Sequence, residues 1–224
     1  MIIDFHIHTR FSYDSMMSPR KILTIARQRG LDGIVVCDHN TVKGGLEVQK
    51  MNRDNDFMVI AGAEIATDAG DVTGIFLSEE IKSRNFTEVA REIRKQGGKL
   101  ILNHPYRGHD LSKVDFSLVD FIEGFNGRTA EADNRKAVEL ARKYAIPIVA
   151  GSDAHLYAEI GNCKTHVADR ETLQIEKTEY RRSSFWHITL SQYIKSIKRR
   201  SFKIFFSATA VHIKHCCKLI FAKK

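Results

Sequence analysis

The amino-acid sequence predicts an α/β protein whose strands and helices alternate around a closed barrel. Apolar runs of strand length alternate with helical patterns over most of the 224 residues. A His, Asp or Glu stands at or just beyond the end of nearly every predicted strand, and α/β barrels build their sites there from several strands. An open sheet would concentrate its functional groups at one switch point instead. A barrel of about 200–250 residues also accounts for the length of the chain.

Six short apolar runs are predicted to be strands, because they are rich in β-branched or aromatic residues and end at polar or glycine-containing segments. They cover residues 1–8, 33–39, 57–65, 99–105, 120–125 and 146–155. The segment DVTGIFL (71–77) is predicted to be an additional strand.

Helices are predicted between these strands, where apolar residues recur every three or four positions. They cover residues 19–30, 86–98 and 129–145, with a weaker helix at 41–52. Ser18 and Pro19 suit the N-cap and the first turn of the first helix. Gly30, Gly97 and Gly98 stand where C-cap glycines are expected. The alternation predicts parallel strands joined by crossover helices.

The composition is that of a soluble globular protein, with 43% hydrophobic and 28% charged residues. No apolar run approaches the ~20 residues that a membrane-spanning helix needs, and the first residues lack the pattern of a secretory signal. The four cysteines form no C-x-x-C pair. We therefore expect a cytoplasmic protein, with peripheral membrane attachment as the alternative.

The charge is divided unevenly along the chain. Residues 1–176 contain 23 Lys and Arg against 26 Asp and Glu, whereas residues 177–224 contain 12 Lys and Arg against one acidic residue, Glu179. We expect a mildly acidic barrel over 1–176 and a basic, helix-rich extension over 177–224.

The candidate ligands point to a metal centre. His6 and His8 are two positions apart in a predicted strand, so they share one face and can bind one ion. Imidazoles and carboxylates without cysteine suit Mn, Zn or Fe, and burying so many of them without metal or partners would cost several kcal/mol each. Eight candidates are too many for one ion, so we expect two to three divalent ions. The eight are His6, His8, Asp14, His39, Glu64, His104, Asp153 and His155.

An ordered set of motifs resembles the PHP (polymerase and histidinol phosphatase) family. The motifs are HxH at 6–8, DH at 38–39, GxE at 62–64, NHP at 103–105 and GSDAH at 151–155. The resemblance covers roughly residues 1–167. It implies a distorted TIM-like (β/α)7 barrel with the metal site at the C-terminal ends of the strands, and a metal-dependent phosphoesterase activity.

The resemblance also implies roles for the ligands. One ion would be held by His6, His8, Glu64 and Asp153. Glu64 would bridge to a second ion, of which His104 would also be a ligand. Asp14, His39 and His155 would belong to a neighbouring or third ion, and Asp38 would orient His39 or donate a proton. Trinuclear relatives have a further His on the strand after Glu64, which 71–77 lacks, so two ions are preferred to three.

Substrate binding is expected from cations and an amide near the strand ends. Arg107, Arg128 and Arg10 are the candidates for phosphate oxygens, and Asn126 is the fourth substrate-binding candidate. We expect a hydroxide that bridges two metals to attack phosphorus while Arg107 takes up charge. His39, His155 or Asp38 would protonate the leaving alkoxide, and Glu64 would be essential.

The predicted function is hydrolysis of a small phosphate ester. The resemblance favours a nucleotide or short oligonucleotide, with histidinol phosphate as the alternative substrate. Two other classes stay open, namely a metal-dependent amidohydrolase and a non-catalytic polyanion-binding module. Competitive inhibition by phosphate would distinguish a phosphoesterase from an amidohydrolase. Truncation after residue 176 would distinguish an enzyme, which should keep its turnover, from a binding module, which should lose its function.

The basic extension is predicted to contain a helix over 191–206, with one apolar face formed by Tyr193, Ile194, Ile197, Phe202 and Phe205. It would cover the barrel, lie on an anionic membrane surface, or contact nucleic acid. Oligomeric state leaves no signature in the sequence.

Overall fold

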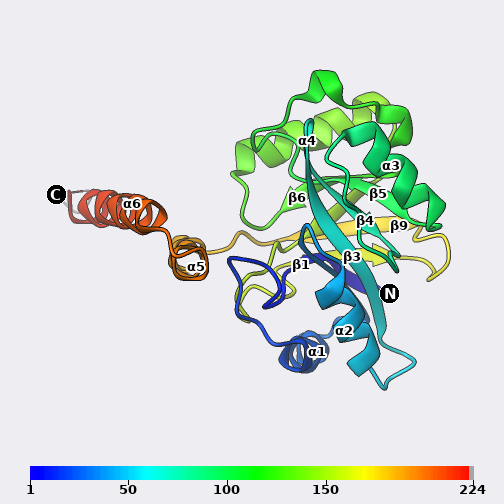
Figure 1. The fold of residues 1–224 in the computed structure, drawn as a ribbon, viewed down its shortest axis with the longest axis horizontal. Coiled ribbons are helices and arrows are strands. Elements are labelled where there is room, and N and C mark those ends of the chain that lie inside the picture. The colour runs from blue at the N-terminus through cyan, green and yellow to red at the C-terminus, as the bar shows by residue number, and fades with distance from the viewer. Residues whose placement is uncertain (222–224) are drawn as a thin grey trace.

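Seven strands follow one another in chain order around a nearly closed barrel in the computed structural model, which describes residues 1–221 (Figure 1). They are β1 (Ile2–Ile7), β2 (Gly33–His39), β3 (Met58–Thr67), β4 (Gly70–Ile75), β5 (Lys99–Leu102), β6 (Phe121–Asn126) and β7 (Ile148–Gly151). The segment after β7 returns to β1, where the His8 amide donates to the Ala154 carbonyl at 2.9 Å and the Ala154 amide donates to the His6 carbonyl at 3.1 Å. The barrel fold is therefore confirmed.

The sheet is mixed, whereas the sequence pattern predicts parallel strands. β4 is antiparallel to both β3 and β5, and the pairs β1–β2, β2–β3, β5–β6 and β6–β7 are parallel. The reason is the connection: only Asp68 and Ala69 separate β3 from β4, which suffices for a hairpin but not for a crossover helix.

Four helices cover the outside of the barrel (Figure 1). They are α1 (Pro19–Gln28), α2 (Lys43–Met51), α3 (Phe86–Lys95) and α4 (Glu131–Tyr144), and two short 3-10 turns lie at Leu111–Lys113 and Phe116–Leu118. Each helix turns an apolar face to the strands, as Ile22 and Ala26 do on α1 and Val89 and Ile93 do on α3.

The interior of the barrel is filled by one apolar cluster below the metal-competent groups. Ile3 and Phe5 of β1 contribute to it, together with Val35, Ile60 and Ile101 from other strands. Ile7 belongs to the outer cluster that packs beneath α1. Ile7 is therefore separated from Ile3 and Phe5, although the three residues alternate along β1. The register of β1 against β2 shifts between Asp4 and Ile7, and this irregularity accounts for the change of face.

The chain after the barrel departs from the sequence-based expectation. A hairpin of β8 (Cys163–Val167) and β9 (Ile175–Tyr180) adds to β1 through antiparallel pairing of β8, and β9 crosses the boundary expected at residue 176. The single helix predicted over 191–206 is wrong: α5 (Phe185–Lys198) and α6 (Phe202–Phe221) are separated by a turn in which Arg200 has φ +49°. No helix among the described residues is both long and apolar enough to cross a bilayer.

Candidate metal centre

His6 and His8 bring their inner nitrogen atoms together at the end of β1. Their Nε2 atoms lie 3.0 Å apart, and both side chains are buried. The outer nitrogen of each ring has its own partner: His6 Nδ1 lies 2.9 Å from Glu123 Oε1, and His8 Nδ1 lies 3.0 Å from Ser12 Oγ. Because these acceptors favour a proton on Nδ1, both Nε2 atoms face the same space, where they would serve as ligands of one metal ion.

Glu64, on β3, lies between the histidines of three segments. Its Oε1 is 3.1 Å from His104 Nε2, and its Oε2 is 2.9 Å from His39 Nδ1 and 3.5 Å from His8 Nε2. Asn103 donates from Nδ2 to Glu64 Oε1 at 3.1 Å and fixes the carboxylate. One carboxylate with both oxygen atoms facing different imidazoles has the arrangement that a bridge between two ions needs.

Asp14 joins the loop after β1 to two further histidines. Its Oδ2 is 3.2 Å from His39 Nε2, and its Oδ1 is 3.2 Å from His155 Nε2. His155 Nδ1 donates to the carbonyl of Asp153 at 2.7 Å, which leaves Nε2 as the free nitrogen. The structure therefore brings Asp14, His39 and His155 together, as the sequence predicts.

Asp153 contacts both the ligand cluster and a cation at its rim. Its Oδ1 is 3.3 Å from His8 Nε2, while Arg107 Nη1 is 2.9 Å and Asn126 Nδ2 3.3 Å from its Oδ2. Asp153 has φ +53°, a left-handed conformation that is uncommon for an Asp. Such strain is typical of functional positions that the surrounding structure holds in place.

The ligand atoms form three overlapping groups, each with its atoms within 4.8 Å of one another. The groups are His8, His39 and His155; His6, His8 and Glu64; and Glu64, Asp71 and His104. Asp71, on β4, is a candidate ligand that the sequence analysis missed, because only a His was expected on the strand after Glu64. Asp71 adds a carboxylate to the group of Glu64 and His104, for which the sequence analysis had expected one ligand too few.

The donor set fits divalent cations. Glu64 Oε2, Asp14 Oδ1 and His104 Nδ1 are buried with no hydrogen-bond partner among the described residues. Buried polar atoms without a partner are costly, and a cation beside the two carboxylate oxygens would offset that cost.

The electrostatics of the metal-free cluster alternate in sign. Burial alone would raise the pKa of Glu64, but His39 and His6 hold that pKa well below its usual range. Burial alone would lower the pKa of His39, but Glu64 and Asp14 raise it to about 10. Burial, together with His155 and His39, lowers the pKa of His8 to about 3. In the metal-free chain Glu64 is therefore ionised, His8 is neutral and His39 carries a proton that metal ligation would displace.

Asp38 anchors the loop that carries Asp14. Its carboxylate accepts from Thr9 N and Thr9 Oγ1, both at 2.7 Å, and from Ser12 Oγ at 2.6 Å. Since Ser12 Oγ also lies 3.0 Å from His8 Nδ1, Asp38 orients His8 through Ser12. A Cβ at Gly44 would clash with Asp38, so α2 approaches this carboxylate closely.

The four substrate-binding candidates lie in different environments. Arg107 stands at the rim with 42% of its side chain exposed, and Asn126 is buried beside it. Arg128 faces α5: it pairs with Glu159 at 3.4 Å and donates to Ser191 Oγ at 2.5 Å. Arg10 is half-exposed and pairs with Glu47 at 2.8 Å. Of the four, the structure places Arg107 and Asn126 next to a candidate ligand.

Glu123 is the second residue that the sequence reasoning missed. It is buried on β6 and accepts from His6 Nδ1, from the His104 amide and from Asn126 Nδ2. A Cβ at Gly151 would clash with Glu123 and His6, so this glycine is needed for the close approach of β7. The feature of the sequence that could have identified it is an acidic residue within the apolar strand DFIEGF.

This chain is similar to a described protein family and to three curated proteins. A family model described as PHP-associated matches residues 131–177. Two uncharacterized proteins of Methanocaldococcus jannaschii are similar to this chain: one is 38% identical over 143 residues (56% of this chain, 82% of the relative), the other 32% identical over 191 residues (80% and 74%). Ribonuclease P protein component 3 of Natronomonas pharaonis is 25% identical over 171 residues (68% and 72%).

Solved structures share the fold at lower sequence identity. A candidate metal-dependent phosphoesterase from Bifidobacterium adolescentis aligns with a TM-score of 0.58 at 15% identity (69% of this chain, 88% of that one). PsfC from Pseudomonas syringae aligns at 0.63 and 19% (88% and 98%). An amidohydrolase from Chromobacterium violaceum, with bound sulfate and no metal, aligns at 0.57 and 14% (80% and 93%). These likenesses concern the fold.

Proposed function

The chain belongs to the PHP family, and from that premise we propose that it is a metal-dependent phosphoesterase that hydrolyses a small phosphate ester. The observation that carries the proposal is the buried cluster of imidazoles and carboxylates with Arg107 at its rim. A planar guanidinium suits the oxygen atoms of a phosphate.

The ligands would hold two or three divalent ions. His6, His8, Glu64 and Asp153 face one position, and Glu64, Asp71 and His104 face another. Asp14, His39 and His155 face a third. When bound, such ions would polarise the phosphoryl oxygens and lower the pKa of water toward ~7.

The side chains of this chain would position the substrate and move the proton. Arg107 would bind a non-bridging phosphate oxygen while Asp153 and Asn126 hold its guanidinium. Of the three candidates for protonating the leaving alkoxide, His39 is the least buried, and it would serve only in a centre in which it is not a metal ligand. Asp38 would then hold the loop and His8 in place.

We propose a nucleotide or short oligonucleotide as the substrate. The similarity to a relative that is, by its name, a protein component of a ribonuclease supports this class. Histidinol phosphate is the second candidate. Both classes would present a phosphate group to the same cluster.

The test starts with elemental analysis of protein purified without chelator and again after Mn loading. Two to three equivalents of Mn, Fe or Zn, together with turnover in a screen of nucleoside bisphosphates, dinucleotides and histidinol phosphate, would support the proposal. No metal in either sample, or no turnover by metal-loaded protein, would contradict it and favour a binding module. Amide hydrolysis that inorganic phosphate does not inhibit would favour the amidohydrolase.

A further inference from the structure

The paired helices α5 and α6 carry two exposed apolar stripes. Trp186, Leu190 and Ile197 lie at positions i, i+4 and i+11 of α5, and Phe202, Phe206 and Ile213 repeat that spacing on α6. At 3.6 residues per turn, such positions lie within about 40° of one another on the helix surface. The exposed fractions are high: 73% for Ile197, 81% for Phe202 and 65% for Phe206. Large aromatic side chains rarely gather in this way on the surface of a monomer.

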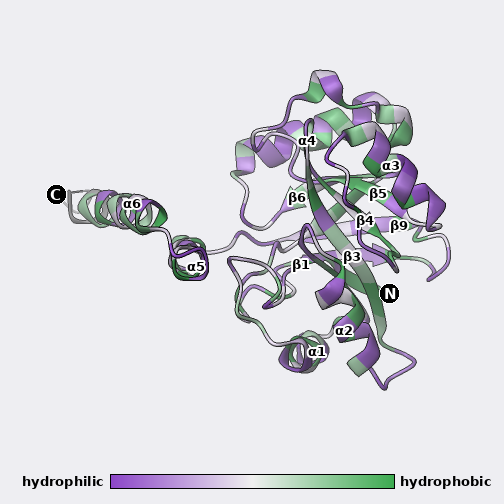
Figure 2. Cartoon of the chain, viewed as in Figure 1, coloured by the Kyte–Doolittle hydropathy of each residue, from purple (hydrophilic) through white to green (hydrophobic). Residues whose placement is uncertain are grey.

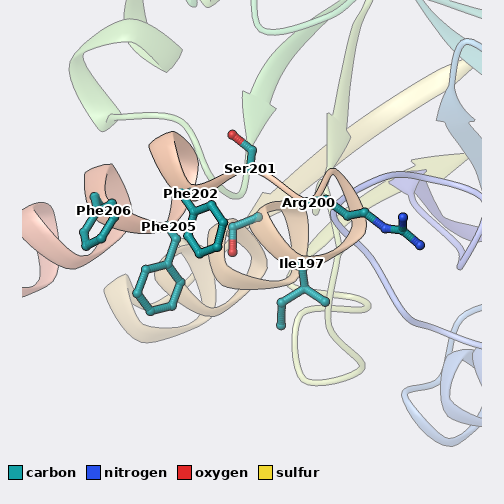
Figure 3. A pocket seen from close by; sticks show the side chains of 7 residues that line it. Ile197, Arg200, Ser201, Phe202, Phe205 and Phe206 are labelled. Atoms are coloured by element: carbon teal, nitrogen blue, oxygen red, sulfur yellow. The ribbon is translucent and has the colours of Figure 1, made fainter.

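The two stripes meet where α5 turns into α6. Ile197, Phe202, Phe205 and Phe206 line one groove there, and Arg200 reaches out at its edge (Figure 3). In Figure 1 α6 lies to one side of the barrel, and Figure 2 shows hydrophobic colour along it. The exposed fractions show that the barrel does not cover this apolar surface.

Cations flank this apolar surface. Arg200, Lys203 and Lys214 are exposed, and residues 177–224 contain 12 Lys and Arg against one acidic residue. Lys195 on α5 and Arg199 just after it contact the barrel instead. Lys195 and Arg199 lie over the Tyr13 ring at 4.7 and 4.1 Å.

The helix pair is also fixed to the barrel, so that its outer surface has a defined orientation. Lys198 Nζ donates to the carbonyls of Arg10, Ser12 and Ser15 at 2.5–3.1 Å. Arg128 of the barrel donates to Ser191 Oγ on α5. These contacts hold α5 along the loop that carries Asp14.

We propose that the α5–α6 pair docks the protein onto an anionic lipid membrane, with the apolar stripes in the interface and Arg200, Lys203 and Lys214 at the headgroups. An apolar face with Trp and Phe beside Lys and Arg is what interfacial helices require. Nucleic acid would match the charge but not the aliphatic Leu190, Ile197 and Ile213. A second copy would match the apolar face but would bring two strongly basic extensions together.

The chain contains a natural probe for this proposal, because Trp186 is its only tryptophan and is 49% exposed on the docking face. The full-length protein is mixed with vesicles of phosphatidylcholine alone or of phosphatidylcholine with phosphatidylserine. We expect co-sedimentation and a blue shift of the Trp186 emission with the anionic vesicles, both weakened by salt. Neither signal with anionic vesicles would overturn the proposal.

Two variants separate the charge from the apolar surface. Arg200→Gln with Lys203→Gln and Lys214→Gln should weaken vesicle binding on the order of 100-fold, since each cation contributes about fivefold. The matched control, Lys82→Gln with Arg91→Gln and Lys95→Gln, removes the same charge from the barrel and should bind as the wild type does. Phe202→Ser with Phe206→Ser should abolish the blue shift, whereas Met16→Ser with Met51→Ser should not.

Unchanged thermal unfolding and metal content in these variants would show that the fold is kept. Wild-type vesicle binding by the basic-to-Gln triple variant would overturn the proposal. The proposal would also be overturned if the wild-type protein bound an oligonucleotide, the triple variant did not, and vesicles left the Trp186 emission unchanged. That result would assign the basic surface to nucleic acid. Self-association that shifts Trp186 without lipid would assign the face to a second copy.

Discussion

Replacing Glu123 by Gln should impair metal binding without touching a ligand. Glu123 Oε1 accepts from His6 Nδ1 at 2.9 Å, and Oε2 accepts from the His104 amide and from Asn126 Nδ2, both at 3.0 Å. A Gln has one oxygen, and two donors converge on the Oε2 position. The amide NH2 would therefore face His6 Nδ1 and move the ring proton to Nε2, the nitrogen that points toward His8.

The magnitude follows from the contacts that change. Removing the partner that orients a metal-ligating His costs about 10–100-fold in affinity. The Gln variant also inverts the tautomer, so we expect a loss of about 100-fold, or ~2.7 kcal/mol. Turning the amide over would restore an acceptor for His6 but leave two buried donors without one, at about 1–3 kcal/mol each. Relaxation of the amide therefore does not rescue binding.

The assay is calorimetric titration of Mn or Zn into chelator-stripped protein. Glu131→Gln, which removes an exposed carboxylate from α4, is the matched control and should bind metal as the wild type does. Circular dichroism and thermal unfolding of both metal-free variants check the fold. A metal affinity of Glu123→Gln within about twofold of the wild type would refute the orienting role of Glu123.

Three further predictions concern the cluster itself. Glu64→Gln should remove most phosphoesterase activity and at least one equivalent of metal while the fold is kept, as kinetics and elemental analysis would show; full activity would exclude a bridging role. His39 carries a proton in the metal-free chain because Glu64 and Asp14, against the effect of burial, raise its pKa to about 10. Its ion pairs should therefore stabilise the metal-free protein fully below about pH 6.5, and that contribution should be lost as the pH rises through about 10, which denaturant unfolding across this range would detect. Metal binding displaces the same proton, so the apparent affinity should rise with pH over this window, and a flat profile would refute the assignment. Arg107→Met should raise the KM for a phosphoester about tenfold or more, because a charge-assisted hydrogen bond is lost, with Arg135→Met as the control; an unchanged KM would exclude substrate binding by Arg107.

The clustering of the candidate ligands could be predicted from the sequence because it depends on local rules. Alternation along β1 places His6 and His8 on one face, and the carboxyl ends of neighbouring strands meet at one end of a barrel. Glu123 and Asp71 obey the same rules, but a lone acidic residue in a strand is also common at a solvated position. Their partners lie on distant segments, so only the fold shows that they face the cluster.

The rest of the fold was hidden by weak local signals. β9 exposes three of the six residues of IEKTEY and buries none of them fully, so it lacks the apolar alternation that predicts a strand. The end of α5 has neither Gly nor Pro: Arg200 takes the left-handed conformation that a glycine usually provides. A continuous helix over 191–206 was therefore the simplest interpretation of the pattern. The packing of α5 against α6 and the barrel decides otherwise.

The contacts of Lys198 tie the basic extension to the loop that carries Asp14. Its ammonium group donates to the carbonyls of Arg10, Ser12 and Ser15 in this loop, although more than 180 residues separate it from them in sequence. Truncation after residue 176 would remove this clamp and cut through β9 as well. A shortened chain that lost activity would thus resemble a scaffold that had lost its binding tail, even if the protein is an enzyme. The single substitution Lys198→Met removes the three hydrogen bonds to the loop and keeps the extension. Its effect on activity therefore shows whether membrane binding by α5 and α6 would be transmitted to Asp14.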